Sequence, residues 1–291
     1  MSRHIDTVSK VLRHNPVDFL PKGELFISRG FLDHFFSNSK EAYVLQIQTA
    51  VESLGLSLVG VDFSSPWSQS FLWDGQYKNF EKYFSVGCIS GPVAGSIETH
   101  GFLNVFLNMK KNPSLFSDMA TTLLKEVEKK VKAARNNGFS AVAVTDDIAG
   151  NKGLLFSLND FMEMIWPIYK QMAEIIKGSA LYAFFHSDGD ITEIIQSLIE
   201  AGYDCIHPID TQAGLNLYTL KKKFGRQITF MGHLDLLAWD EDRIAQEICR
   251  AENEFKYGGL ILGSAGGLSM ETVENKLGVL YPHWKPKELH P

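Results

Sequence analysis

The chain has 291 residues, of which 45% are hydrophobic and 12% aromatic, and its formal net charge is −6. This composition supports a large buried core and excludes a disordered chain. The negative charge, without any dense basic stripe, argues against a nucleic-acid-binding protein. Three cysteines without close spacing cannot form a disulfide framework or a four-thiolate zinc site. Because the N-terminus is polar and no apolar run approaches the roughly 20 residues that span a bilayer, we expect a cytoplasmic protein that does not enter the membrane.

Short apolar runs alternate with amphipathic segments along the chain. The apolar runs predict eight strands, at residues 24–28, 56–63, 83–90, 141–144, 180–185, 204–210, 227–232 and 258–264. The segments between them predict helices, with an ordered excursion over residues 64–82. Strict alternation implies parallel strands joined by right-handed crossovers, and eight repeats fit a (β/α)8 barrel better than an open doubly wound sheet. The first strand–helix turn has no G-x-G-x-x-G dinucleotide motif. We therefore predict a single TIM-barrel domain over residues 1–291.

Polar residues gather where the predicted strands end, the edge at which such barrels place their chemistry. They are Arg29, Asp62, Asp146 and Asp147, His186 and Asp188, His207 and Asp210, and His233 and Asp235, in strand order. Three successive strands end in a histidine that an aspartate follows two or three residues later. Buried imidazoles and carboxylates on one face must be protonated, paired or bound to a cation, and a divalent metal such as zinc is a common solution.

Several of these residues also have a structural explanation. Asp210 and Asp235 are as well suited to capping the next helix, and His207, just before Pro208, to a place in the core. His186 with Asp188 is the pair that we favour as functional. The aromatic residues Trp67, Trp73 and Tyr77 fit loop packing or the wall of a site for a large planar ligand.

The order of short motifs resembles a known superfamily. The motifs are Gly91-Pro92, residues 185–191, Ala201-Gly202-Tyr203-Asp204 with Pro208, residues 229–235, and Glu274-Asn275. Together they are similar to the uroporphyrinogen decarboxylase and cobamide-dependent methyltransferase superfamily, over about residues 13–280. The resemblance implies a (β/α)8 barrel, in agreement with the strand pattern.

The resemblance implies one of two activities. Decarboxylases of the superfamily hold the carboxylates of a porphyrinogen with an arginine-rich segment after the first strand, but residues 27–32 here contain Arg29 alone. Asp62 could match their central aspartate. We consider this carboxy-lyase activity on a tetrapyrrole the second choice, with Asp62 or Asp147 as the polar centre.

The methyltransferase branch moves methyl groups between a small substrate and a corrinoid carried by a separate protein. Its thiol-methylating members bind zinc through a His-x-Cys pair and a later cysteine. His186 matches that histidine, whereas Asp188 replaces the first cysteine and residues 264–267 supply no thiolate. Histidine and carboxylate ligands leave a harder Lewis acid than thiolates do, better suited to polarising an oxygen.

We therefore predict a corrinoid-dependent methyltransferase with a zinc site at the barrel mouth, a corrinoid protein as partner and a small methyl donor or acceptor as substrate. The predicted metal ligands are His186, Asp188 and His233, with Asp146 as an alternative. Asp147, Asp62 and Asp146 are the predicted catalytic residues, and Arg29, Trp67, His207 and Asp235 are predicted to bind substrate or corrinoid. A non-catalytic barrel that binds a corrinoid or its carrier protein is a third possibility, in which His186 and Asp188 would satisfy each other. The donor, the acceptor and the direction of transfer stay open.

Overall fold

Eight parallel strands make the central sheet of the computed structural model, which describes residues 2–36, 43–63, 80–272 and 274–284. The strands are β1 (Gly23–Glu24), β2 (Leu58–Asp62), β3 (Phe84–Ser90), β4 (Ala141–Thr145), β7 (Tyr182–His186), β8 (Cys205–His207), β9 (Thr229–Met231) and β10 (Leu260–Ile261). Each pairs with the next in this order. Backbone hydrogen bonds from Gly23 N to Leu262 O (2.8 Å) and from Leu262 N to Pro21 O (2.9 Å) join the first strand segment to the last. The sheet closes on itself, so the predicted (β/α)8 barrel is confirmed.

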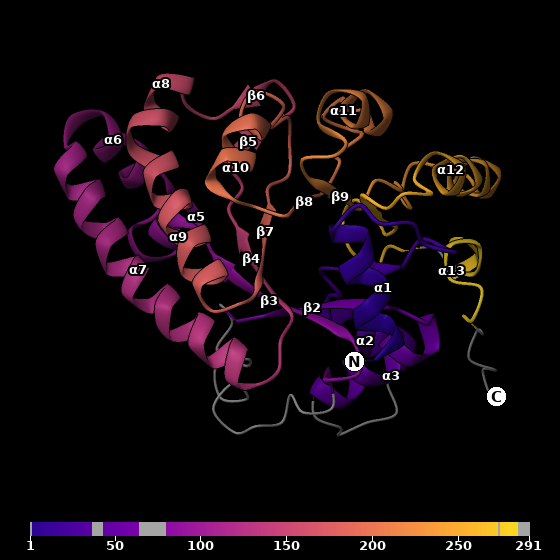
Figure 1. The fold of residues 1–291 in the computed structure, drawn as a ribbon. Helices are drawn as coiled ribbons and strands as arrows, with labels where there is room; N and C mark the ends of the chain where they lie inside the picture. The colour runs from indigo at the N-terminus through magenta and orange to yellow at the C-terminus, as the bar shows by residue number, and fades with distance from the viewer. Residues whose placement is uncertain (1, 37–42, 64–79, 273, 285–291) are drawn as a thin grey trace.

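Helices follow the strands and surround the barrel (Figure 1). They are α1 (Arg3–Leu12), α2 (Arg29–Phe36), α3 (Tyr43–Leu54), α5 (Pro92–His100), α6 (Phe102–Lys111), α7 (Pro113–Asn136), α8 (Leu158–Asp160), α9 (Trp166–Gly178), α10 (Ile195–Ala201), α11 (Leu217–Phe224), α12 (Glu241–Glu254) and α13 (Glu274–Leu280). A π-helical turn (Phe161–Ile165) joins α8 to α9. A short antiparallel hairpin of β5 (Ala149–Gly150) and β6 (Gly153–Leu154) follows β4. Neither the hairpin nor the π-helical turn was expected from the sequence.

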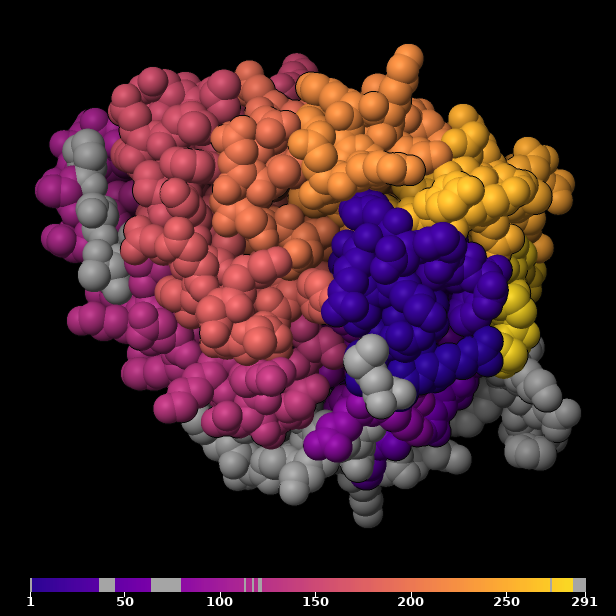
Figure 2. All heavy atoms as spheres, in the orientation of Figure 1, coloured from indigo at the N-terminus to yellow at the C-terminus, as the bar shows by residue number. Residues whose placement is uncertain are grey.

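The strands bury both of their faces, in two separate apolar clusters. Strand residues alternate between the faces of a sheet, so in β4 Ala141 and Ala143 point into the barrel while Val142 and Val144 face the helices. The interior cluster also contains Val8, Val11 and Leu12 of α1. This helix lies across the end of the barrel where the strands begin, in front of the strands in Figure 1, and the N-terminal segment covers that end in the space-filling view (Figure 2). The open end of the barrel is therefore the opposite one, where the strands finish.

Across the described ranges, no helix combines the length and the apolar character that crossing a bilayer requires.

Candidate metal-binding active site

Two histidines point into the barrel at the ends of neighbouring strands. His186 closes β7 and His207 closes β8, and their Cα atoms are register partners. Each lies two residues after an interior side chain, Phe184 and Cys205 respectively, so strand alternation turns both rings inward. Their Nδ1 atoms are 2.9 Å apart, and the ring of Phe26 packs edge-on against both, with centroids 4.7 Å from His186 and 5.9 Å from His207. The rings are therefore fixed by packing as well as by their mutual contact.

Two aspartates complete a group around the Nε2 edge of His186. Ligand atoms of Asp147, His186 and Asp188 all lie within 4.8 Å of one another. His186 Nε2 is 3.5 Å from Asp147 Oδ1, which also accepts a hydrogen bond of 3.0 Å from the backbone N–H of Asp188. The side chain of His186 is buried, whereas both carboxylates are exposed. The group is thus open to solvent on its acidic side.

Two loops are tied together to form this group. The hydroxyl of Ser187 accepts a hydrogen bond of 3.1 Å from the backbone N–H of Ile148, which links the loop after β7 to the loop after β4. Gly189 then turns the chain with φ +87°, and a Cβ there would lie 2.6 Å from the carbonyl carbon of Ala149. Only glycine fits this left-handed turn without displacing the neighbouring loop. Ser187 and Gly189, on either side of Asp188, therefore fix its position beside Asp147.

The charges of the group favour a cation. Burial lowers the pKa of His186 to about 4, an effect that the nearby Asp147 carboxylate opposes, so its imidazole is neutral at pH 7. Partial burial, together with the negative charges of Asp147 and Asp210, raises the pKa of Asp188 to about 6. A neutral imidazole is the form that binds a metal, and a cation would relieve the repulsion between the carboxylates.

The donor set fits a divalent metal. Bonds of about 2.0–2.2 Å in a tetrahedral site place ligand atoms roughly 3.5 Å apart, so small side-chain rotations would bring the three donors to these distances. Three protein ligands leave one position for a substrate, as in catalytic rather than structural zinc sites. The group includes no cysteine among the described residues, so the bound ion would keep the character of a hard Lewis acid.

Two adjoining pockets give a substrate room beside this group. Asp188 lines a pocket of about 200 Å³ together with Asp210 and Asp235. A larger pocket of about 670 Å³ is lined by Phe26, Arg29 and Asp62, among others. The two share Gly266 and Ser269 as lining residues. Arg29 and Asp235, predicted to bind substrate, and Asp62, predicted to be catalytic, therefore line pockets at the same mouth as His186. The guanidinium of Arg29 also pairs with Asp33, at 3.0 Å. Trp67, Trp73 and Tyr77 lie outside the described residues.

Asp146 faces the other way from Asp147. Its carboxylate accepts hydrogen bonds from Val93 N (3.0 Å), Ala94 N (2.5 Å) and the hydroxyl of Tyr169 (2.8 Å). Burial raises its pKa to about 7 although all three donors favour the charged form. Asp146 thus caps the first turn of α5 and links α9 to the barrel, so its carboxylate lies outside the candidate group that contains Asp147.

His233 is also turned away from the group. Gly232, with φ +65°, interrupts the strand alternation just before it. The His233 ring is 1% exposed, and its Nε2 atom lies 3.6 Å from Oε1 of Glu247 on α12. The structure therefore does not bring His233 to the other predicted ligands, and Asp147 is the third member of the candidate group instead. Asp235 accepts hydrogen bonds from Leu237 N and Ala238 N and from the side chain of Gln212, so it holds a loop as well as lining the pocket.

The sequence did not single out Glu24, which is fully buried in β1. Its carboxylate accepts hydrogen bonds from Ser264 N (2.8 Å), Ser264 Oγ (2.6 Å) and the hydroxyl of Tyr281. Burial raises the pKa of Glu24 to about 7. The feature of the sequence that could have identified Glu24 is a carboxylate at the start of an otherwise apolar strand. Its partners show that Glu24 joins the first strand to the loop after the last one.

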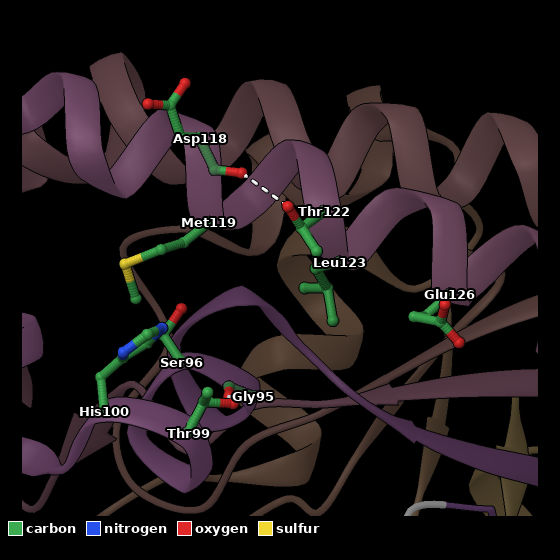
Figure 3. A pocket seen from close by; sticks show the side chains of 9 residues that line it. All are labelled: Gly95, Ser96, Thr99, His100, Asp118, Met119, Thr122, Leu123 and Glu126. Atoms are coloured by element: carbon green, nitrogen blue, oxygen red, sulfur yellow. Dashed lines mark hydrogen bonds between the residues drawn. The ribbon is translucent and has the colours of Figure 1, made fainter.

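A separate groove lies between α5 and α7 and has a volume of about 360 Å³ (Figure 3). Met119 of α7 approaches Ser96 and His100 of α5 across it, whereas the carboxylate of Asp118 points away and Glu126 lies at its far end. None of its lining residues belongs to the strand-end group. Its chemistry therefore does not compete with that of the barrel mouth.

Solved structures share this fold. A methyltransferase from Methanosarcina mazei has a TM-score of 0.78 at 14% sequence identity, with 98% of each chain covered. The D-psicose 3-epimerase of Clostridium cellulolyticum has a TM-score of 0.55 at 10% identity and covers 91% of this chain and 96% of its own. The β-mannanase of the blue mussel Mytilus edulis has a TM-score of 0.52 at 13% identity and covers 93% and 92%. At these identities the likeness concerns the fold alone.

Sequence comparison is more specific. No curated protein sequence is significantly similar to the chain. Residues 86–283, more than half of the chain, match the family model described as uroporphyrinogen decarboxylase (URO-D). That segment runs from β3 to just beyond α13 and contains Asp147, His186 and Asp188. The resemblance seen in the motifs is confirmed, and the chain belongs to the uroporphyrinogen decarboxylase family.

Proposed function

We propose that the protein is a methyltransferase that moves a methyl group between a small substrate and the corrinoid of a partner protein. The observation that carries the proposal is the Asp147–His186–Asp188 group, which lies at the open end of a barrel whose other end is closed. The likeness to the Methanosarcina mazei methyltransferase supports it, since that structure aligns over 98% of both chains at a TM-score of 0.78, against 0.52–0.55 for the sugar-processing barrels.

In this proposal Asp147, His186 and Asp188 hold one divalent ion, with zinc the first candidate. When bound, the ion would polarise the oxygen or other heteroatom that carries the methyl group, so that the heteroatom leaves more readily as an anion. His186 contributes a neutral donor, and the two carboxylates offset the charge of the ion. The 200 Å³ pocket beside Asp188 suits a small substrate. The adjoining 670 Å³ pocket offers room for part of a larger planar ligand, and Arg29 on its wall could donate hydrogen bonds to oxygen atoms of that ligand.

Decarboxylation of a tetrapyrrole is the second candidate, and the position of Asp62 favours it. Asp62 and Arg29 line the same 670 Å³ pocket, so a carboxylated ligand there would meet both. A porphyrinogen carries many carboxylates, however, and Arg29 is the one cationic side chain among the described residues that line this pocket. A polyanion would be poorly neutralised by a single guanidinium.

A methyl-transfer assay separates the two candidates. Zinc-loaded protein is mixed with methylcobalamin and a panel of thiols, and in the reverse direction with reduced cobalamin and methyl ethers or methylamines, while the cobalamin spectrum is followed. The proposal predicts turnover with at least one substrate, its loss in His186→Ala and its retention in His233→Gln. Carbon dioxide release from uroporphyrinogen, without any methyl transfer, would establish the second candidate in its place.

A further inference from the structure

The contact between His186 and His207 couples the protonation of two imidazoles. Their Nδ1 atoms are 2.9 Å apart, and a hydrogen bond at that distance needs a hydrogen on one nitrogen and a lone pair on the other. Both rings are buried, which favours the uncharged form of each imidazole. Each neutral ring carries one hydrogen. The tautomer of one therefore fixes the tautomer of the other.

Only one of the two tautomer pairs allows His186 to bind a metal through Nε2. Its Nε2 atom lies in the group with Asp147 and Asp188, and it can bind an ion only through a lone pair. The hydrogen of His186 must then be on Nδ1 and be donated to Nδ1 of His207. The hydrogen of His207 must in turn be on its own Nε2.

The surroundings of His207 suit this arrangement. Its Nε2 atom has no hydrogen-bond partner among the described residues, so no donor competes for a lone pair there. The ring is 1% exposed, and a Cβ on Gly232 would come within 3.0 Å of its Nε2 atom. The packing of Phe26 against the buried ring keeps the Nδ1 edge of His207 directed at His186.

We propose that His207 is a positioning residue, which accepts the Nδ1 hydrogen of His186 and so keeps the Nε2 lone pair of His186 directed at the Asp147 and Asp188 carboxylates. The inference rests on the metal site of the proposed function. It gives His207 a role in metal binding without contact with the metal or the substrate. In the opposite arrangement His207 donates to His186, whose Nε2 hydrogen then faces Asp147, and a metal finds no lone pair.

Zinc affinity measured by competition with a chromophoric chelator tests the proposal without any turnover. His207→Phe keeps a ring in the core but accepts no hydrogen bond, and we expect its zinc affinity to fall about 10–100-fold, as for other outer partners of a metal-bound histidine. His207→Gln offers an amide oxygen to the same hydrogen, and we expect its affinity to stay within about threefold of the original. Cys205→Ala removes another interior side chain of β8 and should leave the affinity unchanged. Thermal unfolding in chelator checks that each variant is folded.

The tautomer itself can be observed in zinc-loaded protein by long-range ¹H–¹⁵N spectra of labelled histidine. We expect hydrogens on His186 Nδ1 and on His207 Nε2. A hydrogen on His207 Nδ1, an unchanged zinc affinity in His207→Phe, or equal losses in the Phe and Gln variants would each overturn the inference. If the original protein binds no zinc, this inference and the proposed metal site fail together. If the affinities follow the expected order but no methyl transfer occurs, only the proposed function fails.

Discussion

His186 and His233 occupy equivalent places in the sequence and opposite places in the structure. Each histidine directly follows a predicted strand, and an aspartate, Asp188 or Asp235, follows it two residues later. His186 keeps the alternation of β7 and points into the barrel mouth. His233 follows Gly232, whose φ of +65° breaks the alternation, and it lies against Glu247 of α12. The same motif thus forms part of a candidate metal site in one strand and an internal polar contact in the other.

The neighbours Asp146 and Asp147 show the same contrast over one residue. The carboxylate of Asp146 faces the helices and accepts three hydrogen bonds, whereas that of Asp147 is exposed beside His186. The direction of the side chain, set by strand alternation and by single glycines, separates ligand candidates from structural residues. Each of the following substitutions tests that division.

The largest effect is expected from the two histidines. His186→Ala removes the nitrogen donor of the group, and we expect zinc affinity to fall by more than the roughly 100-fold that loss of an outer partner costs at most. His233→Ala should leave the affinity nearly unchanged and lower the stability, because it opens a cavity beside Glu247. Isothermal titration with zinc and thermal unfolding measure the two effects. Equal losses of affinity in both variants would remove the distinction between the two histidines.

The two aspartates should divide in the same manner with smaller effects. Asp147→Asn weakens one ligand, and we expect about tenfold lower zinc affinity with little change in stability. Asp146→Asn places an amide hydrogen against the donors from Val93, Ala94 and Tyr169, and we expect a loss of about 1–3 kcal/mol in the free energy of unfolding. Urea denaturation of the metal-free proteins gives the second quantity. The division between the neighbours fails if Asp146→Asn alters metal affinity more than Asp147→Asn does.

The last test concerns Glu24, a buried carboxylate outside the metal group, whose substitution should change only the pH dependence of stability. Its folded-state pKa is raised to about 7 from 4.5, so the folded protein binds the extra proton between these pH values and its stability falls as the pH rises through them. The amide of Glu24→Gln does not titrate in this pH range. The stability of the original protein relative to the variant should therefore decrease by up to about 1.4 kcal/mol per pH unit in that window, without change in zinc affinity. Urea denaturation from pH 4.5 to pH 7.5 measures the slope, and a parallel pH dependence of both proteins would contradict the raised pKa.

The barrel could be predicted from the sequence because each strand is a continuous apolar run between amphipathic helices. Strand lengths could not be predicted as well. The apolar run at residues 258–264 contains a strand of only Leu260–Ile261, because backbone pairing, and not apolar character, defines the ends of a strand. His186 and Asp188 could be singled out from their place at a strand end. The choice of Asp147 over His233 could not, because it depends on the turn at Gly189, on the conformation of Gly232 and on the link from Ile148 to Ser187.

Anomalous diffraction from crystals soaked in zinc tests the central claim most directly, since it locates the ion without reference to any activity. We expect one strong peak within bonding distance of His186 Nε2 and the Asp147 and Asp188 carboxylates. A peak between His233 and Glu247, or no ordered peak at the barrel mouth, would contradict the assignment of this group as the metal site.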